Sequence, residues 1–139
     1  MSTLNAFTTL HCAYQEVPDR LTRALGGETA TVPLRVPVGD LRLEKDVVLT
    51  LRPKPGYPGY VLLDVAWEPK DGGPYPSFSG TLSVQDEGFG WSRIDLDGTY
   101  RPPLSVVGAV FDAAVGKRMA EATADELLRH ITTLVAAAV

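Results

Sequence analysis

The sequence contains a single cysteine, Cys12, so it cannot form an intrachain disulfide. A lone cysteine outside any reactive motif is typical of a small buried hydrophobic residue, and we expect that role here. Long apolar runs are missing too, because none approaches the ~18 residues that a membrane-spanning helix needs. The N-terminus lacks a basic stretch followed by an apolar core, so no signal peptide is predicted. These absences predict a cytoplasmic protein in a reducing setting, with no membrane span.

Basic residues are neither abundant nor clustered. The chain has 13 Lys and Arg against 17 Asp and Glu, which gives a formal net charge of −4. Nucleic-acid binding relies on Lys and Arg gathered on one surface to neutralise phosphates. The composition therefore argues against a nucleic-acid partner, and by the same reasoning against an anionic membrane surface.

Catalytic and metal-binding motifs are also absent. The two histidines, His11 and His130, fall on separate predicted elements, whereas a zinc site needs three or four protein ligands. The patterns HExxH, GxSxG and GxxxxGK do not occur. The glycines at 88 and 90 indicate a turn, since no helix follows them. We expect no metal, no cofactor and no assigned catalytic residue.

Carboxylates are plentiful, and a close pair can create an acid by raising one pKa. Asp95 and Asp97 are two residues apart on one strand face. They share that face with Arg93, opposite Ile94 and Leu96, so a solvated outer face with an ordinary ion pair is the favoured interpretation. Asp64 lies mid-strand among apolar residues, and the alternation places it on the outer face as well.

Prolines and glycines divide the 139 residues into short alternating segments, which is typical of antiparallel strands in a single domain over 1–139. Pro18 and Gly26 suit the two ends of a short helix. Pro33 and Pro37 predict an edge strand, because proline cannot donate a ladder hydrogen bond. The predicted strands cover 4–15, 30–38, 41–52, 60–68, 78–85 and 89–100, with the short helix in 17–27 and a hairpin turn at 86–88.

From Pro103 onward the apolar residues change to a spacing of three to four. This predicts one helix of about nine turns, with its inner stripe formed by Leu104, Val107, Phe111, Val115, Met119, Ala122, Leu127, Ile131 and Leu134. A helix longer than the strands must cross the sheet. The fold class predicted is α+β, a curved antiparallel sheet wrapped on one long C-terminal helix.

The stretch from 78 to 131 carries a family resemblance. A strand there ends in Gly98 and Tyr100, and Pro102 and Pro103 lead into the final helix. This order resembles the START and polyketide-cyclase-like (SRPBCC, helix-grip) superfamily, in its uncharacterised bacterial branch. The resemblance implies an apolar cavity between sheet and helix, which relatives use to bind lipids, sterols, plant metabolites or polyketide intermediates.

Relatives usually place two helices after the first strand. Here only 17–27 is available, which leaves open a shallower or more open cavity, or one completed by a second copy in a homodimer.

Inner-face aromatics and the bend of the sheet indicate where a ligand would bind. Gly80 removes a side chain at the centre of the inner face and is expected to leave volume there. Tyr100 and Arg101 precede the long helix and are expected to supply polar anchors at the rim. The predicted ligand-binding residues are Val65, Trp67, Phe78, Gly80, Leu82, Tyr100, Val107 and Phe111.

Three functions are compatible with this reading. The first is binding of a small hydrophobic ligand, a lipid or polyketide-like metabolite, and the sequence favours it over catalysis. The second is a polyketide cyclase or dehydratase-like enzyme, which rests on the resemblance alone. The third is a protein-interaction subunit whose cavity is filled by side chains, and the single short helix supports it because sheet surface is left for a partner.

Overall fold

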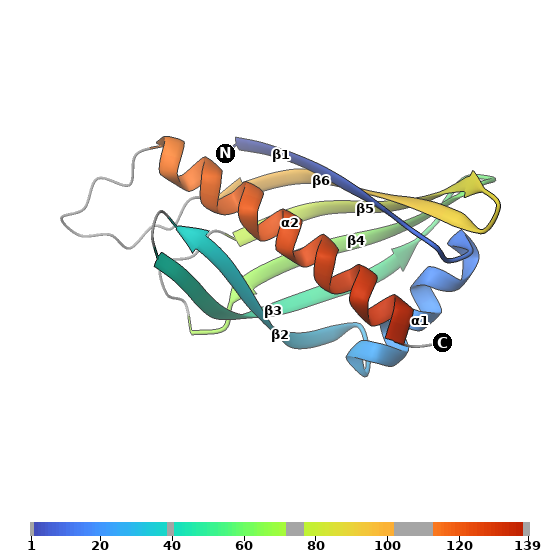
Figure 1. Cartoon of the computed structure of the whole chain (residues 1–139), viewed down its shortest axis with the longest axis horizontal. Helices are drawn as coiled ribbons and strands as arrows, with labels where there is room; N and C mark the ends of the chain where they lie inside the picture. The colour runs from blue at the N-terminus through green and yellow to red at the C-terminus, as the bar shows by residue number, and fades with distance from the viewer. Residues whose placement is uncertain (1, 39–40, 72–76, 102–112, 138–139) are drawn as a thin grey trace.

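The structure, a computed structural model, describes residues 2–38, 41–71, 77–101 and 113–137. Six strands and a long helix dominate it, in the order shown in Figure 1. A single turn of 3-10 helix, Tyr14–Glu16, precedes the short helix. The elements are β1 (Ser2–Leu10), α1 (Val17–Leu25), β2 (Thr29–Val38), β3 (Leu41–Lys54), β4 (Tyr60–Pro69), β5 (Ser77–Gly88), β6 (Trp91–Arg101) and α2 (Ala113–Ala137).

All the strands belong to one antiparallel sheet in the order β1-β6-β5-β4-β3-β2. Strands β2 to β6 follow one another as a meander, and β6 pairs on its other side with β1, the first strand of the chain. The edges are therefore β1 and β2. The edge position predicted from Pro33 and Pro37 is confirmed, and Pro33 is exposed.

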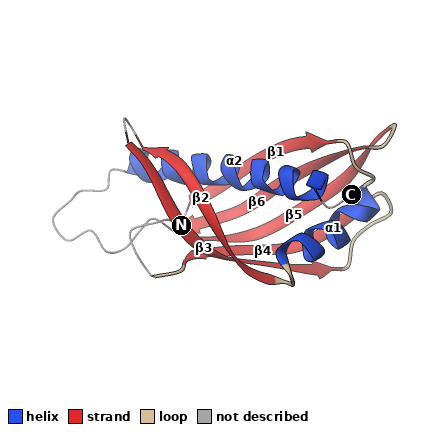
Figure 2. Ribbon diagram, turned by 60° about the horizontal axis from the view of Figure 1, so that its bottom comes forward, coloured by secondary structure: helices blue, strands red, loops and turns tan. Residues whose placement is uncertain are grey.

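The helix α2 lies along one face of the sheet (Figures 1 and 2). It contacts β1 and β2, the two edge strands, and also α1. A sheet whose opposite edges both reach one helix must curl around it, which the right-handed twist of strands permits. The predicted fold class, a curved antiparallel sheet on one long C-terminal helix, is confirmed.

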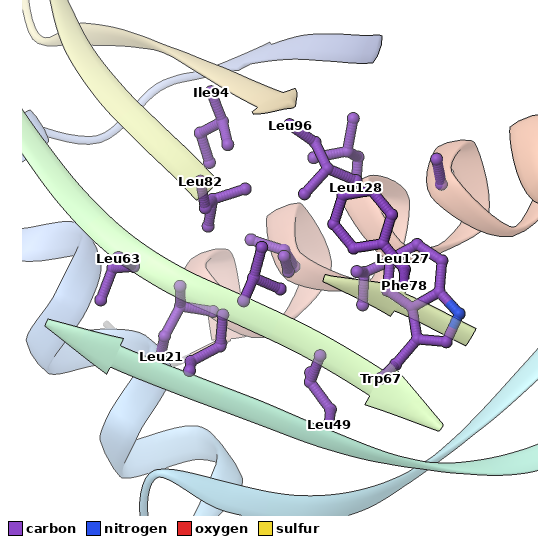
Figure 3. Packing of buried hydrophobic residues seen from close by; sticks show 14 of the residues in the cluster. Leu21, Leu49, Leu63, Trp67, Phe78, Leu82, Ile94, Leu96, Leu127 and Leu128 are labelled. Carbon is purple, nitrogen blue, oxygen red and sulfur yellow. The ribbon is translucent and has the colours of Figure 1, made fainter. Parts of the chain in front are cut away.

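The hydrophobic core fills the space between the sheet and α2. Leu82, Ile94 and Leu96 from the sheet lie close to Leu127 and Leu128 of the helix in Figure 3. These five side chains are at most 2% exposed. Full burial of one such side chain stabilises the fold by roughly 1.5–3 kcal/mol. Strand alternation and the helical stripe thus meet in a single core.

Two predicted boundaries are wrong. The first strand was expected to reach residue 15, but β1 ends at Leu10 and the chain turns into the 3-10 helix and α1. The hairpin turn expected at 86–88 lies at Phe89 and Gly90 instead. β5 continues to Gly88, three residues beyond its predicted end, with a register shift between Asp86 and Gly88, and Phe89 adopts a φ of 56°. The bulge accommodates one extra residue, Glu87, before the turn.

The ends of the helices agree with the sequence where they are described. Gly26 ends α1 with a φ of 78°, and its backbone N–H donates to the Arg23 carbonyl, as expected of a C-terminal glycine. The described part of the long helix begins at Ala113, so the predicted residues Leu104, Val107 and Phe111 lie outside the described residues. Neither helix in the described ranges is long and apolar enough to cross a membrane.

Candidate functional site

The predicted inner-face residues lie together in the core. Trp67 and Phe78, paired across β4 and β5, stack with ring centroids 4.5 Å apart and an interplanar angle of 15° (Figure 3). Val65, Leu82 and Tyr100 are buried beside them. Each of these five side chains is at most 3% exposed. The other two predicted side chains, Val107 and Phe111, lie outside the described residues.

Gly80 does not leave the volume expected of it. It faces Gly98 across β5 and β6, and a Cβ at Gly80 would lie 2.1 Å from the Asp97 carbonyl oxygen. A Cβ at Gly98 would lie 2.6 Å from Cζ of Phe78. The two glycines therefore let the strands and the Phe78 ring approach closely, and the expectation of free space at Gly80 is wrong.

The core offers little acid–base chemistry. Among the described residues the buried polar side chains are Ser92 and Thr123. The Ser92 hydroxyl donates to the Cys12 carbonyl, and the Thr123 hydroxyl donates to the Met119 carbonyl at 2.6 Å. Both hydroxyls are thus committed to backbone oxygens. No Asp, Glu, His, Lys or Arg is buried among the residues whose side chains the structure describes.

The two histidines and the cysteine occupy separate surroundings. His11 is exposed, and its ring centroid lies 5.0 Å from that of Trp91. His130 is half-buried on α2, and burial is the main reason that its pKa is lowered. Cys12 is buried as expected, and burial raises the pKa of its thiol. In the described part of the chain, no three His, Cys, Asp or Glu residues gather as a metal site would require.

The carboxylates singled out from the sequence lie on the outer face of the sheet, as predicted. Arg93 donates to the Asp95 carboxylate from Nε, at 3.0 Å to Oδ2 and 3.3 Å to Oδ1, and from Nη2, at 3.1 Å to Oδ1. Its guanidinium lies 4.1 Å from the Phe7 ring centroid. Asp64 pairs with Lys54 at 3.1 Å. Asp95 and Asp64 therefore each have a cationic partner on this face.

The outer face also bears a hollow of about 430 Å³ that the sequence interpretation missed. It lies over the ends of β4, β5 and β6 and is lined by Ala66, Glu68, Ser77, Phe78, Ser79, Thr99 and Arg101. We call it the hydroxyl hollow. Arg101 was expected beside Tyr100 as a second anchor, but the two side chains point to opposite faces: Tyr100 is buried in the core and Arg101 lines the hollow. The sequence signal that could have indicated this hollow is a set of small residues on the outer face with long charged residues beside them.

Comparison with known proteins shows the fold. No family model and no curated protein matches the sequence. A conserved protein from Geobacillus kaustophilus matches 98% of this chain and 96% of its own, with a TM-score of 0.61 and 12% identity. The Zhui aromatase/cyclase from Streptomyces sp. R1128 matches 99% of this chain and 93% of its own, with a TM-score of 0.56 and 12% identity. The chain therefore shares its helix-grip arrangement with an aromatase/cyclase.

Proposed function

We propose that the protein binds a small apolar molecule, of lipid or polyketide-like chemistry, in a cavity between the sheet and the long C-terminal helix. The stacked pair of Trp67 and Phe78 carries this proposal, because it forms a flat apolar surface on the inner face. Ligand pockets are mostly lined by such aromatic and aliphatic groups. The proposed contacts are Val65, Trp67, Phe78, Gly80, Leu82, Tyr100, Val107 and Phe111.

Binding is favoured over catalysis because no described Asp, Glu, His, Lys or Arg side chain is buried in the core, where Cys12 and Tyr100 are the buried ionisable groups. The fold shared with an aromatase/cyclase supports a small-molecule site, and similarity at 12% identity carries no residue roles. The rings of Trp67 and Phe78 are buried and stacked on each other. An apolar guest must therefore displace or slide along these rings, so binding should perturb Trp67 directly.

The protein has two tryptophans, one in the core and one exposed, which makes a matched experiment available. Trp91→Phe leaves Trp67 as the only tryptophan whose fluorescence is measured, and Trp67→Phe leaves Trp91. We expect 1-anilinonaphthalene-8-sulfonate to accept energy from Trp67 saturably, and palmitate or 2-naphthol to displace it. Native mass spectrometry of protein purified from its own host should then show a bound small molecule.

Dye that reports only from Trp91 would place binding on the exterior and reject the inner site. Absence of dye binding in both variants would reject apolar-ligand binding altogether. Circular dichroism of both variants confirms that each is folded before its emission is interpreted.

A second candidate is a protein-interaction subunit, the function expected if the inner space is filled. Exposed aromatics near the β5–β6 turn and on β1 favour it: Phe89 at the turn is fully exposed, and Trp91 and Phe7 are about half exposed. Exposed apolar surface of this kind often contacts a partner. A homodimer is one such assembly. Sedimentation at increasing protein concentration tests it, and Phe89→Ser should weaken any self-association that is seen.

A further inference from the structure

The hydroxyl hollow lies on the side of the sheet opposite the proposed apolar site. Its floor is made by short side chains in register, since Ala66 pairs with Ser79 and Ser79 pairs with Thr99. Glu68 on β4 and Arg101 on β6 stand on either side of β5. Their backbones are two strand spacings apart, roughly 10 Å. Short residues between two long charged ones produce a depression with opposite charges at its two ends.

The polar groups of the hydroxyl hollow have no partners within the described part of the chain. None of its three hydroxyl groups forms a side-chain hydrogen bond there, and neither of its charged side chains forms an ion pair. Elsewhere on the surface charged side chains do pair, as Arg35 does with Glu44 at 3.3 Å. The hollow thus combines a guanidinium, a carboxylate and hydroxyls that remain available to a ligand.

The chemistry of these groups specifies the ligand. A guanidinium offers a planar pair of donors that matches a carboxylate, and serine and threonine hydroxyls donate to the same oxygens. A carboxylate such as that of Glu68 accepts hydrogen bonds from a protonated amine. The volume of about 430 Å³ lies within the range of small-molecule sites. Because the chain has a net charge of −4, a ligand without net charge meets no long-range repulsion.

We propose that the hydroxyl hollow is a second binding site, for a small zwitterion that carries a carboxylate and a protonated amine. Arg101 binds the carboxylate, Glu68 binds the amine, and the hydroxyls of Ser77, Ser79 and Thr99 donate hydrogen bonds to the carboxylate oxygens. This site lies on the opposite side of the sheet from the proposed apolar site, because Tyr100 and Arg101 direct adjacent side chains to opposite faces, although Phe78 borders both sites.

Backbone amide NMR titrations with three matched probes test the proposal. The probes are γ-aminobutyrate, which carries both charges, butyrate, which lacks the amine, and n-butylamine, which lacks the carboxylate. We expect γ-aminobutyrate to shift the amides of Ser77, Ser79 and Thr99 saturably. Each single-charge probe should bind at least about tenfold more weakly, since one charge-assisted contact is lost.

Variants then assign the two ends of the ligand. Arg101→Gln should weaken γ-aminobutyrate binding at least about tenfold and leave n-butylamine binding unchanged. Glu68→Gln should also weaken γ-aminobutyrate binding at least about tenfold, but leave butyrate binding unchanged. Arg35→Gln removes an exposed arginine from β2 and serves as the control, with unchanged binding expected.

Three results would overturn the proposal. One is the absence of saturable shifts with every probe up to about 50 mM, a concentration at which a millimolar site is filled. Another is butyrate binding as tightly as γ-aminobutyrate, which would remove the role of Glu68. The third is wild-type affinity in Arg101→Gln. Loss of dye binding at the apolar site would leave this test unaffected.

Discussion

Strands β4, β5 and β6 present two faces that differ in how completely their side chains are occupied. On the inner face, Trp67, Phe78 and Leu82 are packed against one another and against the core. On the outer face, one or two residues away along the same strands, Ser77, Ser79 and Arg101 line an open hollow. The packed inner face therefore stabilises the fold, but a ligand can bind there only by displacing contacts that already exist. The outer face contributes less stability and keeps its polar groups available.

The largest effect should come from the inner face. Trp67→Ala removes a fully buried ring and its stacking partner for Phe78, so the free energy of unfolding should fall by about 3–5 kcal/mol. Glu68→Ala, at the next position on the outer face, should change it by less than about 0.5 kcal/mol. Urea denaturation of both variants measures the contrast. Equal effects would show that the two faces do not differ in packing.

The contact between Gly80 and Gly98 should be the next most sensitive feature. Gly80→Ala places a methyl group where the Asp97 carbonyl oxygen lies, so the strands must separate. We expect a loss of about 2–3 kcal/mol, as overpacking usually costs. Ser79→Ala on the outer face is the matched control and should be nearly neutral. A neutral Gly80→Ala in thermal denaturation would contradict the close approach of β5 and β6.

A smaller effect is expected at the ion pair of Arg93 and Asp95. Both side chains are only partly exposed, but water reaches the pair, so its net contribution should be small. Arg93→Ala and Asp95→Ala should each lower the melting temperature by less than about 4 °C. The double variant tests whether the effects depend on each other. A fall above about 10 °C in either single variant would show a buried pair and a wrong assignment of the outer face.

The smallest effect concerns pH and His130 on α2. Burial holds the pKa of this imidazole below its unfolded value of about 6.5, so the unfolded chain binds the proton more readily. Its contribution to stability is therefore complete above that value and is lost as pH falls below it, through the lowered folded pKa. His130→Gln should flatten the loss of stability between about pH 7 and 5.

Thr133→Gln is the control for the pH measurement, because it adds the same side chain at an exposed position of α2 and removes no ionisable group. Its pH curve should follow that of the wild-type protein. An unchanged slope in His130→Gln would show that this imidazole is as solvated in the folded protein as in the unfolded chain.

Local patterns were enough to predict most of the fold. The alternation along 78–85 and 60–68 assigned inner and outer faces correctly, because side chains in a strand alternate by geometry alone. The prolines at 33 and 37 predicted an edge strand, since a missing N–H can be recognised without knowing the partner strand. The three-to-four spacing from Pro103 onward predicted a long helix, of which Ala113–Ala137 is described as α2, and burial of Met119, Leu127 and Ile131 follows that spacing.

The features that only the tertiary structure decided are those that depend on which residues meet across neighbouring strands. Sequence alone could not place Gly80 opposite Gly98, and this pairing turns an expected space into a close contact. Nor could it bring Glu68 and Arg101, more than thirty residues apart in the chain, to the two sides of one hollow. The side-chain period of a strand is local, whereas register and curvature are set by pairing and by the helix on which the sheet closes.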